Sequence, residues 1–324
     1  MERKSDQPTF VDAAALELGG PRTMAFLDKC EWLIPWDELA RSVAGVFARP
    51  AQGEPARGGR PHWPVKLYVK CLLLQRWFNL SDPQLEEQLR DRLSFRRFVG
   101  LGLSEPTPDE TALVVFRRRL REAGHERTLL EAVNRHLEKL GLMLHTGTLV
   151  DAMIVEAPRG RTKPDGTSTR DAQASFTKKR DQTYHGYKAH IASDLRGLVK
   201  DFRFDTARVH DSQHIDELIR KEKTFVGADS AYMDQEREAR LHKRGVCFGV
   251  IKRRVRGQAE LPAWQRALNR AWSAIRAVVE HPFAWMRNMG YRKVRYRGLA
   301  RNELDFGLLA AAYNLKRSFS LRGA

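Results

Sequence analysis

The change in the apolar pattern near residue 145 constrains the fold of this chain most strongly. Before that point, apolar residues recur at helical spacing, and segment 65–78 has the apolar density of a largely buried helix. After it, short apolar runs such as 148–156 and 224–229 alternate with segments of helical pattern. We therefore expect an all-helical unit followed by an α/β unit built around a mixed sheet.

Capping signals divide the first part into helices. Ser81 precedes Asp-Pro and is the expected N-cap of a second helix. Residues 107–110 form a capping-box pattern with proline at the first helical position, which predicts a helix toward Arg121. A fourth helix is expected over 125–140, and Gly141 follows it. The Pro- and Gly-rich segment 50–61 reads as a linker or exposed loop.

Strand and helix signals alternate in the second part. The polar, basic stretch 158–182 is predicted to be a mobile loop. Residues 194–197 have the composition of a hairpin turn between two strands. The expected strands are 148–156, 185–193, 198–206, 224–229 and 246–251, and the expected helices are 212–221, a segment within 234–244, and 262–289.

The charge balance points to a polyanionic partner. The 324 residues carry a formal net charge of +17, and the pI is near 10.1. The sequence contains no run of about 18 apolar residues, so no membrane span is predicted. The first residues lack the apolar segment of a signal peptide. Three widely spaced cysteines suit reduced thiols and support neither a disulfide framework nor a zinc site. A cytoplasmic protein is the resulting expectation.

Three acids lie in contexts suited to holding a divalent metal ion. Asp151 lies inside the apolar run 149–155, and Asp229 ends the run 225–229. Glu280 lies in a segment, 251–298, that contains twelve Lys or Arg and only one other acid. Because carboxylates that converge in a buried site repel each other and lose hydration, they usually share a cation. In so basic a chain, such a site favours chemistry on nucleic acid.

A polar stripe surrounds Glu280 on the expected helix 262–289. At about 100° per residue, Ser273, Arg276, Glu280 and Arg287 fall within roughly 60° of one another. A carboxylate between two guanidinium groups can bind metal while its neighbours grip phosphate. The opposite side of the helix is apolar and is expected to pack on the sheet. Pro282 is expected to kink the helix.

These acids and several further stretches resemble the DDE transposases of bacterial insertion sequences, and more narrowly the group named after insertion sequence five. The resemblance covers residues from about 60 to 318, and the helical block is similar to the transposase N-terminal domain. It rests on Asp151, on the Arg276-x3-Glu280 spacing and on the segment 294–299 near the end of the chain. Four further motifs support it: Ala228-Asp229-Ser230-Ala231-Tyr232, His185-Gly186-Tyr187-Lys188-Ala189-His190, Thr206-Ala207-Arg208-Val209-His210-Asp211-Ser212 and Val279-Glu280-His281-Pro282-Phe283.

The resemblance implies a ribonuclease-H-like, mixed-sheet catalytic domain with flanking helices, an α/β fold behind a helical N-terminal domain. The implied parts are a segment and linker (1–59), a helical domain for DNA-end binding or dimerisation (60–142) and the catalytic domain (143–324). Asp151, Asp229 and Glu280 would bind two Mg²⁺ ions, with Mn²⁺ as a substitute, about 3.5–4 Å apart. The implied reaction is cleavage at the inverted-repeat ends of an element, followed by transfer of the 3′-OH into target DNA.

The resemblance also implies DNA contacts and an assembly. The family pattern is Tyr-x2-Arg-x3-Glu-x6-Lys; here Ser273 replaces the tyrosine and Arg287 the lysine, with the spacing intact. The implied partners are the inverted-repeat ends and a target duplex, in a homodimer or larger synaptic complex in the bacterial cytoplasm, at the nucleoid when bound to DNA. The expected DNA-contacting residues are Arg276, Arg287, Lys188, Ser273, Lys178, Lys179 and Arg180.

Simpler interpretations stay open for single residues. Taken alone, Asp151 is compatible with a structural hydrogen-bond acceptor, and Asp229 with a cap of the next segment. Glu280 is compatible with a surface ion pair to Arg276, four residues earlier on the same helix. Tyr232 is more compatible with packing than with a recombinase nucleophile, and residues 178–180 with a solvated charge run. Two alternatives remain for the whole chain: a ribonuclease-H-like nuclease without strand transfer, and a domesticated transposase that only binds DNA.

Overall fold

The computed structural model describes residues 22–47, 61–179, 181–254 and 260–323, which group into two compact units. The first unit ends at Val133 and the second begins at Asn134, inside helix α8 (Thr128–Lys139). The domain boundary expected at 142–143 follows the end of that helix and stays a prediction. Arg180 and most of the expected linker lie outside the described residues.

The first unit is helical, as the sequence predicts. Helix α4 occupies the predicted segment and is buried on nearly every side. At α5, the Ser81 hydroxyl accepts a hydrogen bond from the Gln84 backbone N–H, and the Gln84 side chain accepts one from the Ser81 N–H, which confirms the predicted cap. The helices are α2 (Arg22–Leu33), α3 (Trp36–Ser42), the 3-10 turn η1 (Ala44–Phe47), α4 (Val65–Phe78), α5 (Asp82–Asp91), α6 (Leu93–Val99) and α7 (Glu110–Glu122).

The predicted start of α7 is wrong by two residues. Asp109, not Thr107, is the N-cap, and its carboxylate accepts a hydrogen bond from the Ala112 N–H at 2.7 Å. Pro108 therefore lies before the cap rather than in the first helical turn. Aspartate caps a helix as well as threonine does. The motif 107–110 is therefore compatible with a helix start at either Thr107 or Asp109.

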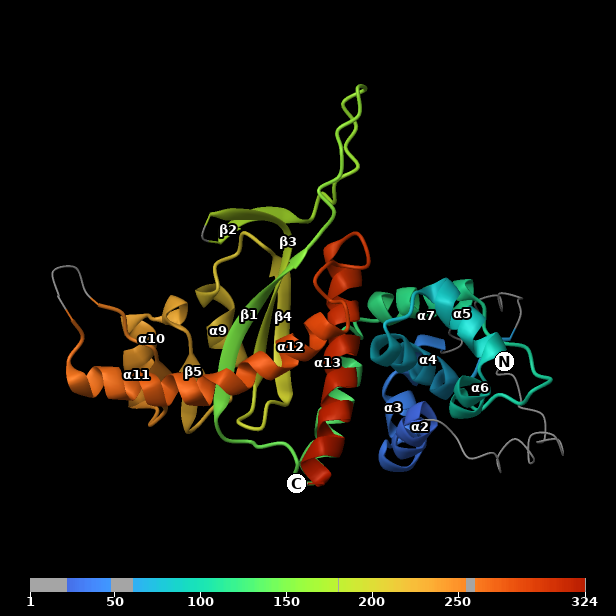
Figure 1. Ribbon diagram of the computed structural model, residues 1–324, viewed down its shortest axis with the longest axis horizontal. Helices are drawn as coiled ribbons and strands as arrows, with labels where there is room; N and C mark the ends of the chain where they lie inside the picture. Colours follow the sequence, from blue (N-terminus) through green and yellow to red (C-terminus); the bar gives the residue numbers. More distant parts are fainter. Residues whose placement is uncertain (1–21, 48–60, 180, 255–259, 324) are drawn as a thin grey trace, which may run out of the picture. The chain divides into compact units, whose positions relative to one another are not determined.

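The second unit is built on one six-stranded mixed sheet (Figure 1). The central strand β1 (Thr148–Glu156) pairs antiparallel with β3 (Gln182–Ser193) and parallel with β5 (Phe225–Ala228), which pairs parallel with β6 (Cys247–Val250). The far edge of β3 carries β2 (Ser175–Lys179) along its first part and β4 (Val199–Thr206) along the rest. The expected fold class, a helical N-terminal part followed by an α/β domain with a mixed sheet and flanking helices, is confirmed.

Helices cover both faces of this sheet. On one face, α9 (Ser212–Leu218) and α10 (Gln235–Lys243) enclose an apolar core that includes Val150, Val226 and Tyr232. On the other face, Phe306 of α13 (Leu299–Arg322) packs against Phe202 of β4, with ring centroids 5.1 Å apart. In Figure 1, α13 and α12 (Glu280–Asn288) lie across the sheet on that side.

Gly186 permits a close crossing at the end of β1. A Cβ atom at this position would lie 2.1 Å from the Val155 carbonyl oxygen, so no other residue fits without moving a backbone. The same strand segment pairs with β1 on one edge and with β2 on the other. The glycine in the sequence motif 185–190 therefore serves strand packing.

The predicted helix 262–289 is wrong as a single element. It consists of α11 (Ala263–Arg276), the 3-10 segment η3 (Ala277–Val279) and α12, which begins at Glu280. Pro282 has no N–H to donate to the residue four before it, and its ring crowds that residue's carbonyl, which lies in η3. The proline that is expected to kink the helix therefore coincides with the interruption.

Two further elements differ from the sequence prediction. The stretch 158–182, predicted as a mobile loop, contains β2 and a short hairpin that ends in the turn 164–166. Helix α13 is not predicted from the sequence, although it is the longest helix described. Within the described parts of the chain, no helix combines the length and apolarity needed to cross a membrane.

Candidate active site

Two neighbouring parallel strands place Asp151 and Asp229 beside each other. The register pairs Val150 of β1 with Ala228 of β5, and the next residue on each strand is an aspartate. Strand β5 ends at Ala228, so Asp229 caps the 3-10 turn η2 (Ser230–Tyr232). Its Oδ1 accepts hydrogen bonds from the Ser230 backbone N–H at 2.6 Å and from the Ser230 hydroxyl at 3.2 Å. The strand ladder therefore sets the spacing of these two acids.

Arg276 connects the strand acids to the helix acid. Its Nη1 lies 3.3 Å from Oδ2 of Asp151, and its Nη2 lies 3.0 Å from Oε1 of Glu280. Arg276 is the last residue of α11 and Glu280 the first of α12, one turn later. The Asp151 side chain is 23% exposed and that of Glu280 is 54% exposed, so the guanidinium joins a sheltered carboxylate to an open one.

The environment of Asp151 disfavours its negative charge. Burial raises the pKa of the Asp151 carboxyl, and the nearby carboxylates of Asp229 and Glu280 raise it further. The Ala152 N–H, which donates to Oδ1 at 2.8 Å, and the Arg276 guanidinium act in the opposite direction without reversing the shift. Asp151 therefore lies within electrostatic range of both other acids, and the Arg276 guanidinium offsets their effect on it only in part.

The donor set fits a hard divalent cation. Carboxylate oxygens are the ligands that Mg²⁺ and Mn²⁺ prefer, and a cation would relieve the repulsion that acts on Asp151. Among the described residues, however, no three Asp, Glu, His or Cys side chains are grouped closely enough to hold one ion. The Arg276 guanidinium contacts both Asp151 and Glu280. Metal binding by all three acids therefore requires that their side chains come closer together than in this structure.

Comparison with known families decides what kind of protein carries this site. The family model described as a transposase DDE domain matches residues 143–315, which is more than half of the chain. The chain belongs to the DDE transposases. A second model, described as a transposase domain (DUF772), matches residues 20–119 and so covers most of the helical unit. Enzymes of this family use divalent metal ions, which agrees with the donor set at Asp151.

Two solved transposase complexes are similar to this chain at a low level. The piggyBac transposase synaptic complex with hairpin DNA is 10% identical, with a TM-score of 0.47 over 92% of this chain and 74% of that chain. The Mos1 strand transfer complex is 12% identical, with a TM-score of 0.20 over 77% of this chain and 82% of that chain. Likeness at this level transfers no individual residue to this transposase.

The other predicted DNA-contacting residues of the transposase are divided by exposure. Ser273 on α11, Arg287 on α12, and Lys178 and Lys179 on the edge strand β2 are exposed. Lys188 is buried: its ammonium donates to the Val209 carbonyl at 2.7 Å and pairs with Asp211 at 2.8 Å. This placement favours a structural role for Lys188 over the DNA contact expected from the sequence.

Tyr232 is a packing residue in this structure, as the sequence analysis favours. It is 1% exposed and belongs to the core between the sheet and α9. Burial raises the pKa of its phenol, and the carboxylates of Asp211, Asp151 and Asp229 raise it further. A phenol that resists ionisation and is closed to solvent is poorly suited to act as a nucleophile on DNA.

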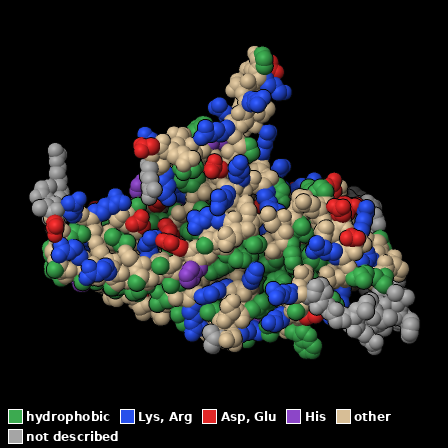
Figure 2. All heavy atoms as spheres, viewed as in Figure 1, with side chains coloured by type: hydrophobic (Ala, Val, Ile, Leu, Met, Phe, Trp, Pro, Cys, Tyr) green, Lys and Arg blue, Asp and Glu red, His purple; other side chains and the backbone are tan. Residues whose placement is uncertain are grey.

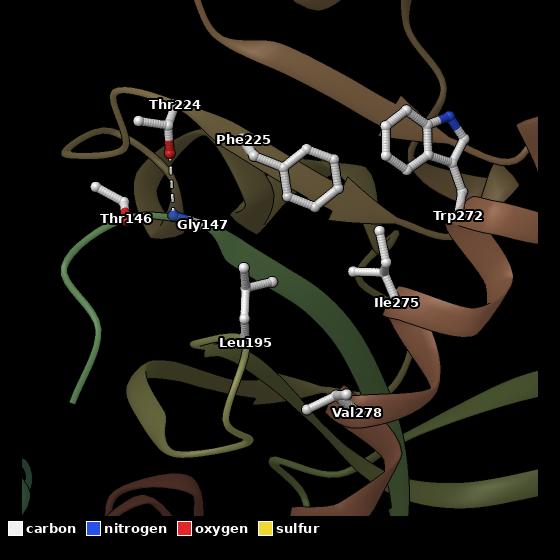
Figure 3. A pocket seen from close by; sticks show the side chains of 8 residues that line it. All are labelled: Thr146, Gly147, Leu195, Thr224, Phe225, Trp272, Ile275 and Val278. Atoms are coloured by element: carbon white, nitrogen blue, oxygen red, sulfur yellow. Dashed lines mark hydrogen bonds between the residues drawn. The ribbon is translucent and has the colours of Figure 1, made fainter. Parts of the chain in front are cut away.

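An apolar pocket lies under α11, beside the residues that carry Arg276. Its volume is about 380 Å³, and Figure 3 shows Phe225, Leu195, Trp272 and Ile275 directed into it. The Trp272 and Phe225 rings stack with centroids 5.1 Å apart. Helix α11 has no fully buried residue, and the Trp272–Phe225 stacking beside this pocket joins it to β5.

Two features of this region are not predicted from the sequence: the contact of Arg276 with Asp151, and the ordered hairpin that follows β1. The Arg276–Asp151 contact joins residues 125 positions apart, and no local pattern predicts it. The hairpin carries a local signal, Pro164-Asp165-Gly166, which is typical of a type I turn followed by a left-handed glycine.

Proposed function

We propose that this DDE transposase cleaves DNA at the inverted-repeat ends of its element and transfers the 3′-OH into target DNA, with Asp151, Asp229 and Glu280 as catalytic and metal-binding residues. One observation carries the proposal: the β1–β5 register places two aspartates side by side, and Arg276 ties the glutamate of the next helix to the same place. Within a chain of this family, that arrangement is suited to phosphodiester chemistry.

We infer two Mg²⁺ ions, for which Mn²⁺ can substitute. When bound, such ions would activate the attacking oxygen and stabilise the leaving one. Asp151 and Asp229 supply carboxylates whose direction is fixed by the Ala152 and Ser230 N–H groups. Glu280 is the most exposed of the three and begins a helix after a 3-10 segment, so it is the acid best able to move toward the other two.

We infer that Arg276 acts both before and after the acids bind a cation. Before a cation is bound, its guanidinium neutralises Asp151 and Glu280. Once the acids bind a cation, the guanidinium is released and can pair with a phosphate of the DNA. Ser273, Arg287, Lys178, Lys179 and Arg180 are further proposed DNA contacts, whereas we assign Lys188 to the fold.

The finer family assignment rests on the same motifs. We infer membership of the bacterial group named after insertion sequence five and action in the bacterial cytoplasm. The helical domain 60–142 is proposed to bind DNA ends or to dimerise, ahead of the catalytic domain 143–324. Joining two ends requires a synapse, so we expect a homodimer or larger assembly on DNA.

A cleavage and joining assay on the element's terminal DNA tests the function. Wild type is compared with Asp151→Asn, Asp229→Asn and Glu280→Gln in Mg²⁺ and in Mn²⁺, and DNA binding is measured for each protein. We expect wild type to cut and join. Each variant should bind DNA but lose about 10³-fold or more in cleavage rate, because removing one preorganised charge-stabilising group costs on the order of 10²–10³ and a metal ligand costs more.

The other outcomes identify the rival functions. Cleavage without joining by wild type would favour a ribonuclease-H-like nuclease, and binding without cleavage would favour a domesticated DNA-binding protein. Variants that cut as fast as wild type would exclude these acids as the metal site. Lys223→Ala, an exposed cation before β5, serves as a control and should cut normally.

A further inference from the structure

The segment between β1 and β2 projects from the catalytic sheet as a narrow hairpin, called the finger here (residues 158–170). Figure 1 shows it standing clear of the strands above β2 and β3. Its two sides are joined by hydrogen bonds from Lys163 N to the Thr167 carbonyl at 2.8 Å and from Thr169 N to the Arg161 carbonyl at 2.9 Å. The finger is therefore a paired ribbon.

Turn chemistry fixes the tip of the finger. Gly166 has φ +79° and its N–H donates to the Lys163 carbonyl at 3.0 Å, as in a type I turn with a G1 bulge. The Asp165 carboxylate accepts hydrogen bonds from the Thr167 hydroxyl and N–H, which lower the pKa of Asp165. The single acid of the finger thus stabilises the turn.

The root of the finger is anchored in the sheet domain. The buried Asp171 carboxylate accepts hydrogen bonds from the Tyr187 hydroxyl at 2.6 Å and from the Gly298 N–H at 2.8 Å. Gln173 accepts one from the Leu299 N–H at 2.6 Å, and Arg159 donates to the Thr183 carbonyl at 2.8 Å. These contacts join the root to β3 and to the start of α13, so the direction of the finger is fixed.

The composition of the finger suits nucleic acid rather than protein. Its only apolar side chains are two prolines, so it offers almost no surface for a hydrophobic interface. It has one acid, Asp165, and four cations. Cations and hydroxyls are the groups that contact phosphate and sugar. The cations are Arg159, Arg161, Lys163 and Arg170, and the hydroxyls are Thr162, Thr167, Ser168 and Thr169.

Strand pairing sorts these groups onto two faces. Thr162 is bridged to Ser168, so these two small side chains share one face. Arg161 and Lys163, one residue to either side of Thr162, lie on the other face. Both are exposed. One face thus presents Arg161 and Lys163, while Thr162 and Ser168 keep the opposite face thin near the tip, and Arg170 follows on that face at the root.

The basic surface continues from the finger to its root. The loop between α12 and α13 (residues 289–298) is attached to the end of β1 by two hydrogen bonds. Glu156 N donates to the Arg292 carbonyl at 3.0 Å, and Val294 N donates to the Glu156 carbonyl at 2.8 Å. That loop and β2 carry exposed Arg292, Lys293, Arg297, Lys178 and Lys179. Figure 2 shows Lys and Arg side chains on the projecting finger and around its base.

We propose that the finger enters a groove of duplex DNA, where Arg161 and Lys163 contact the phosphates that border it. The major groove of B-DNA admits a two-stranded ribbon. The basic surface at the root of the finger would contact the backbone of the same duplex. The inference rests on the proposed function, because it takes the DNA to be the transposon end or the target. Both share the phosphate-lined groove.

Salt-dependent binding without cleavage tests the proposal. Arg161→Ala/Lys163→Ala is compared with Lys221→Ala/Lys223→Ala, a matched pair of exposed cations at the opposite end of β1. Full-length proteins are titrated with a duplex at several salt concentrations without divalent metal. The finger variant should lower the slope of log Kobs against log[salt] by about 2, because each lost phosphate contact lowers it by about 1. The matched pair should leave it unchanged.

Equal slopes for the two double variants would overturn the proposal. The same titration on Asp151→Asn separates it from the function proposed above: that variant should lose cleavage but keep the wild-type slope. A finger variant that keeps the wild-type slope while Asp151→Asn abolishes cleavage overturns the finger alone. If Asp151→Asn cuts like wild type, the proposed function fails instead.

A cross-linking amino acid incorporated at Ser168 identifies the partner. We expect it to attach to duplex DNA; attachment to a second protein chain, or to single strands but not duplex, would overturn the proposal. Cross-linking only to the element's own end would identify the terminal duplex, and equal cross-linking to an unrelated duplex would identify the target.

Discussion

Helices α11 and α13 lie on the same face of the sheet, yet they are held in different ways. Fourteen of the 24 residues of α13 are buried, whereas none of the 14 residues of α11 is. Helix α13 fills the core against β4, and α11 leaves a partly empty apolar pocket at Phe225. The contrast predicts that α11, which leads into Arg276 and Glu280, shifts more easily than α13.

The largest expected effect is on the scaffold helix. Phe306→Ala should lower the free energy of unfolding by about 3–5 kcal/mol, because it leaves a cavity against Phe202 and Phe204. Urea unfolding would measure the change. Leu268→Ala on α11, where the side chain is 37% exposed, is the matched control and should cost less than about 1 kcal/mol. Equal losses would remove the contrast between the helices.

The polar contact between α13 and β4 should come next. Asn314 accepts a hydrogen bond from the Val199 N–H at 2.8 Å and donates to the Val199 carbonyl and to Asn134. Asn314→Ala leaves the buried Val199 N–H without its acceptor and should cost about 2 kcal/mol in the same unfolding experiment. Ser320→Ala, an exposed position on α13, should change stability by less than about 0.5 kcal/mol. A neutral Asn314→Ala would mean that this contact is unimportant.

On α11, activity should respond more than stability. Trp272→Ala removes the stacking on Phe225 and enlarges the pocket, at a cost of about 1–2 kcal/mol. The cleavage rate should fall by about tenfold or more, because Arg276 lies one turn further along and small misplacements in an active site are costly. Trp272→Phe should recover most of the rate. A proportionate loss of stability and rate by α13 variants would argue against a special role for α11.

Arg276 offers a sharper test of the freedom of this helix. Arg276→Gln removes the charge that pairs with Asp151 and Glu280, so Mn²⁺ should bind more tightly in the absence of DNA. The expected gain is about fivefold, which corresponds to about 1 kcal/mol for an ion pair of this kind. Calorimetric titration would measure it, with Arg287→Gln as the control. Weaker Mn²⁺ binding by Arg276→Gln would contradict the role assigned to Arg276.

The last expected effect concerns the pH dependence of stability. Burial raises the pKa of Asp151 above its unfolded value, so the native state holds this proton at pH values where the unfolded state has lost it. Stability should therefore fall as pH rises between the two pKa values, by at most about 1.4 kcal/mol per pH unit. Asp151→Asn should remove this component of the profile. Because metal binds the carboxylate form, Mn²⁺ affinity should rise over the same range.

Local signals predict much of the fold. The apolar run 148–156 marks β1, the density of 65–78 marks α4, and Ser81 with Gln84 marks a cap, because each feature depends on neighbouring residues alone. Helix α13 escapes prediction because it is buried around most of its circumference, which erases the helical period. The finger escapes because its polar strands lack alternating apolar residues, although its turn is marked by Pro164-Asp165-Gly166.

The candidate site is only partly predictable for a related reason. Residue type and motif identify Asp151, Asp229 and Glu280 as candidates. Their proximity depends on a strand register and on a contact between residues 151 and 276, which are long-range properties. The sequence analysis places Glu280 on one continuous helix with Arg276, and the 3-10 interruption between them emerges only when the chain packs.

The β1–β5 register also sets which parts of the chain tolerate insertions and deletions. Side chains alternate between the faces of a strand, so one residue added or lost within 148–151 would turn Asp151 to the opposite face and separate it from Asp229. The tip of the finger has no such constraint, because both of its strands lie outside the core. Related chains should therefore keep the length of the first segment and vary in the second, and a peptide inserted beside Asp165 should leave the acids in place.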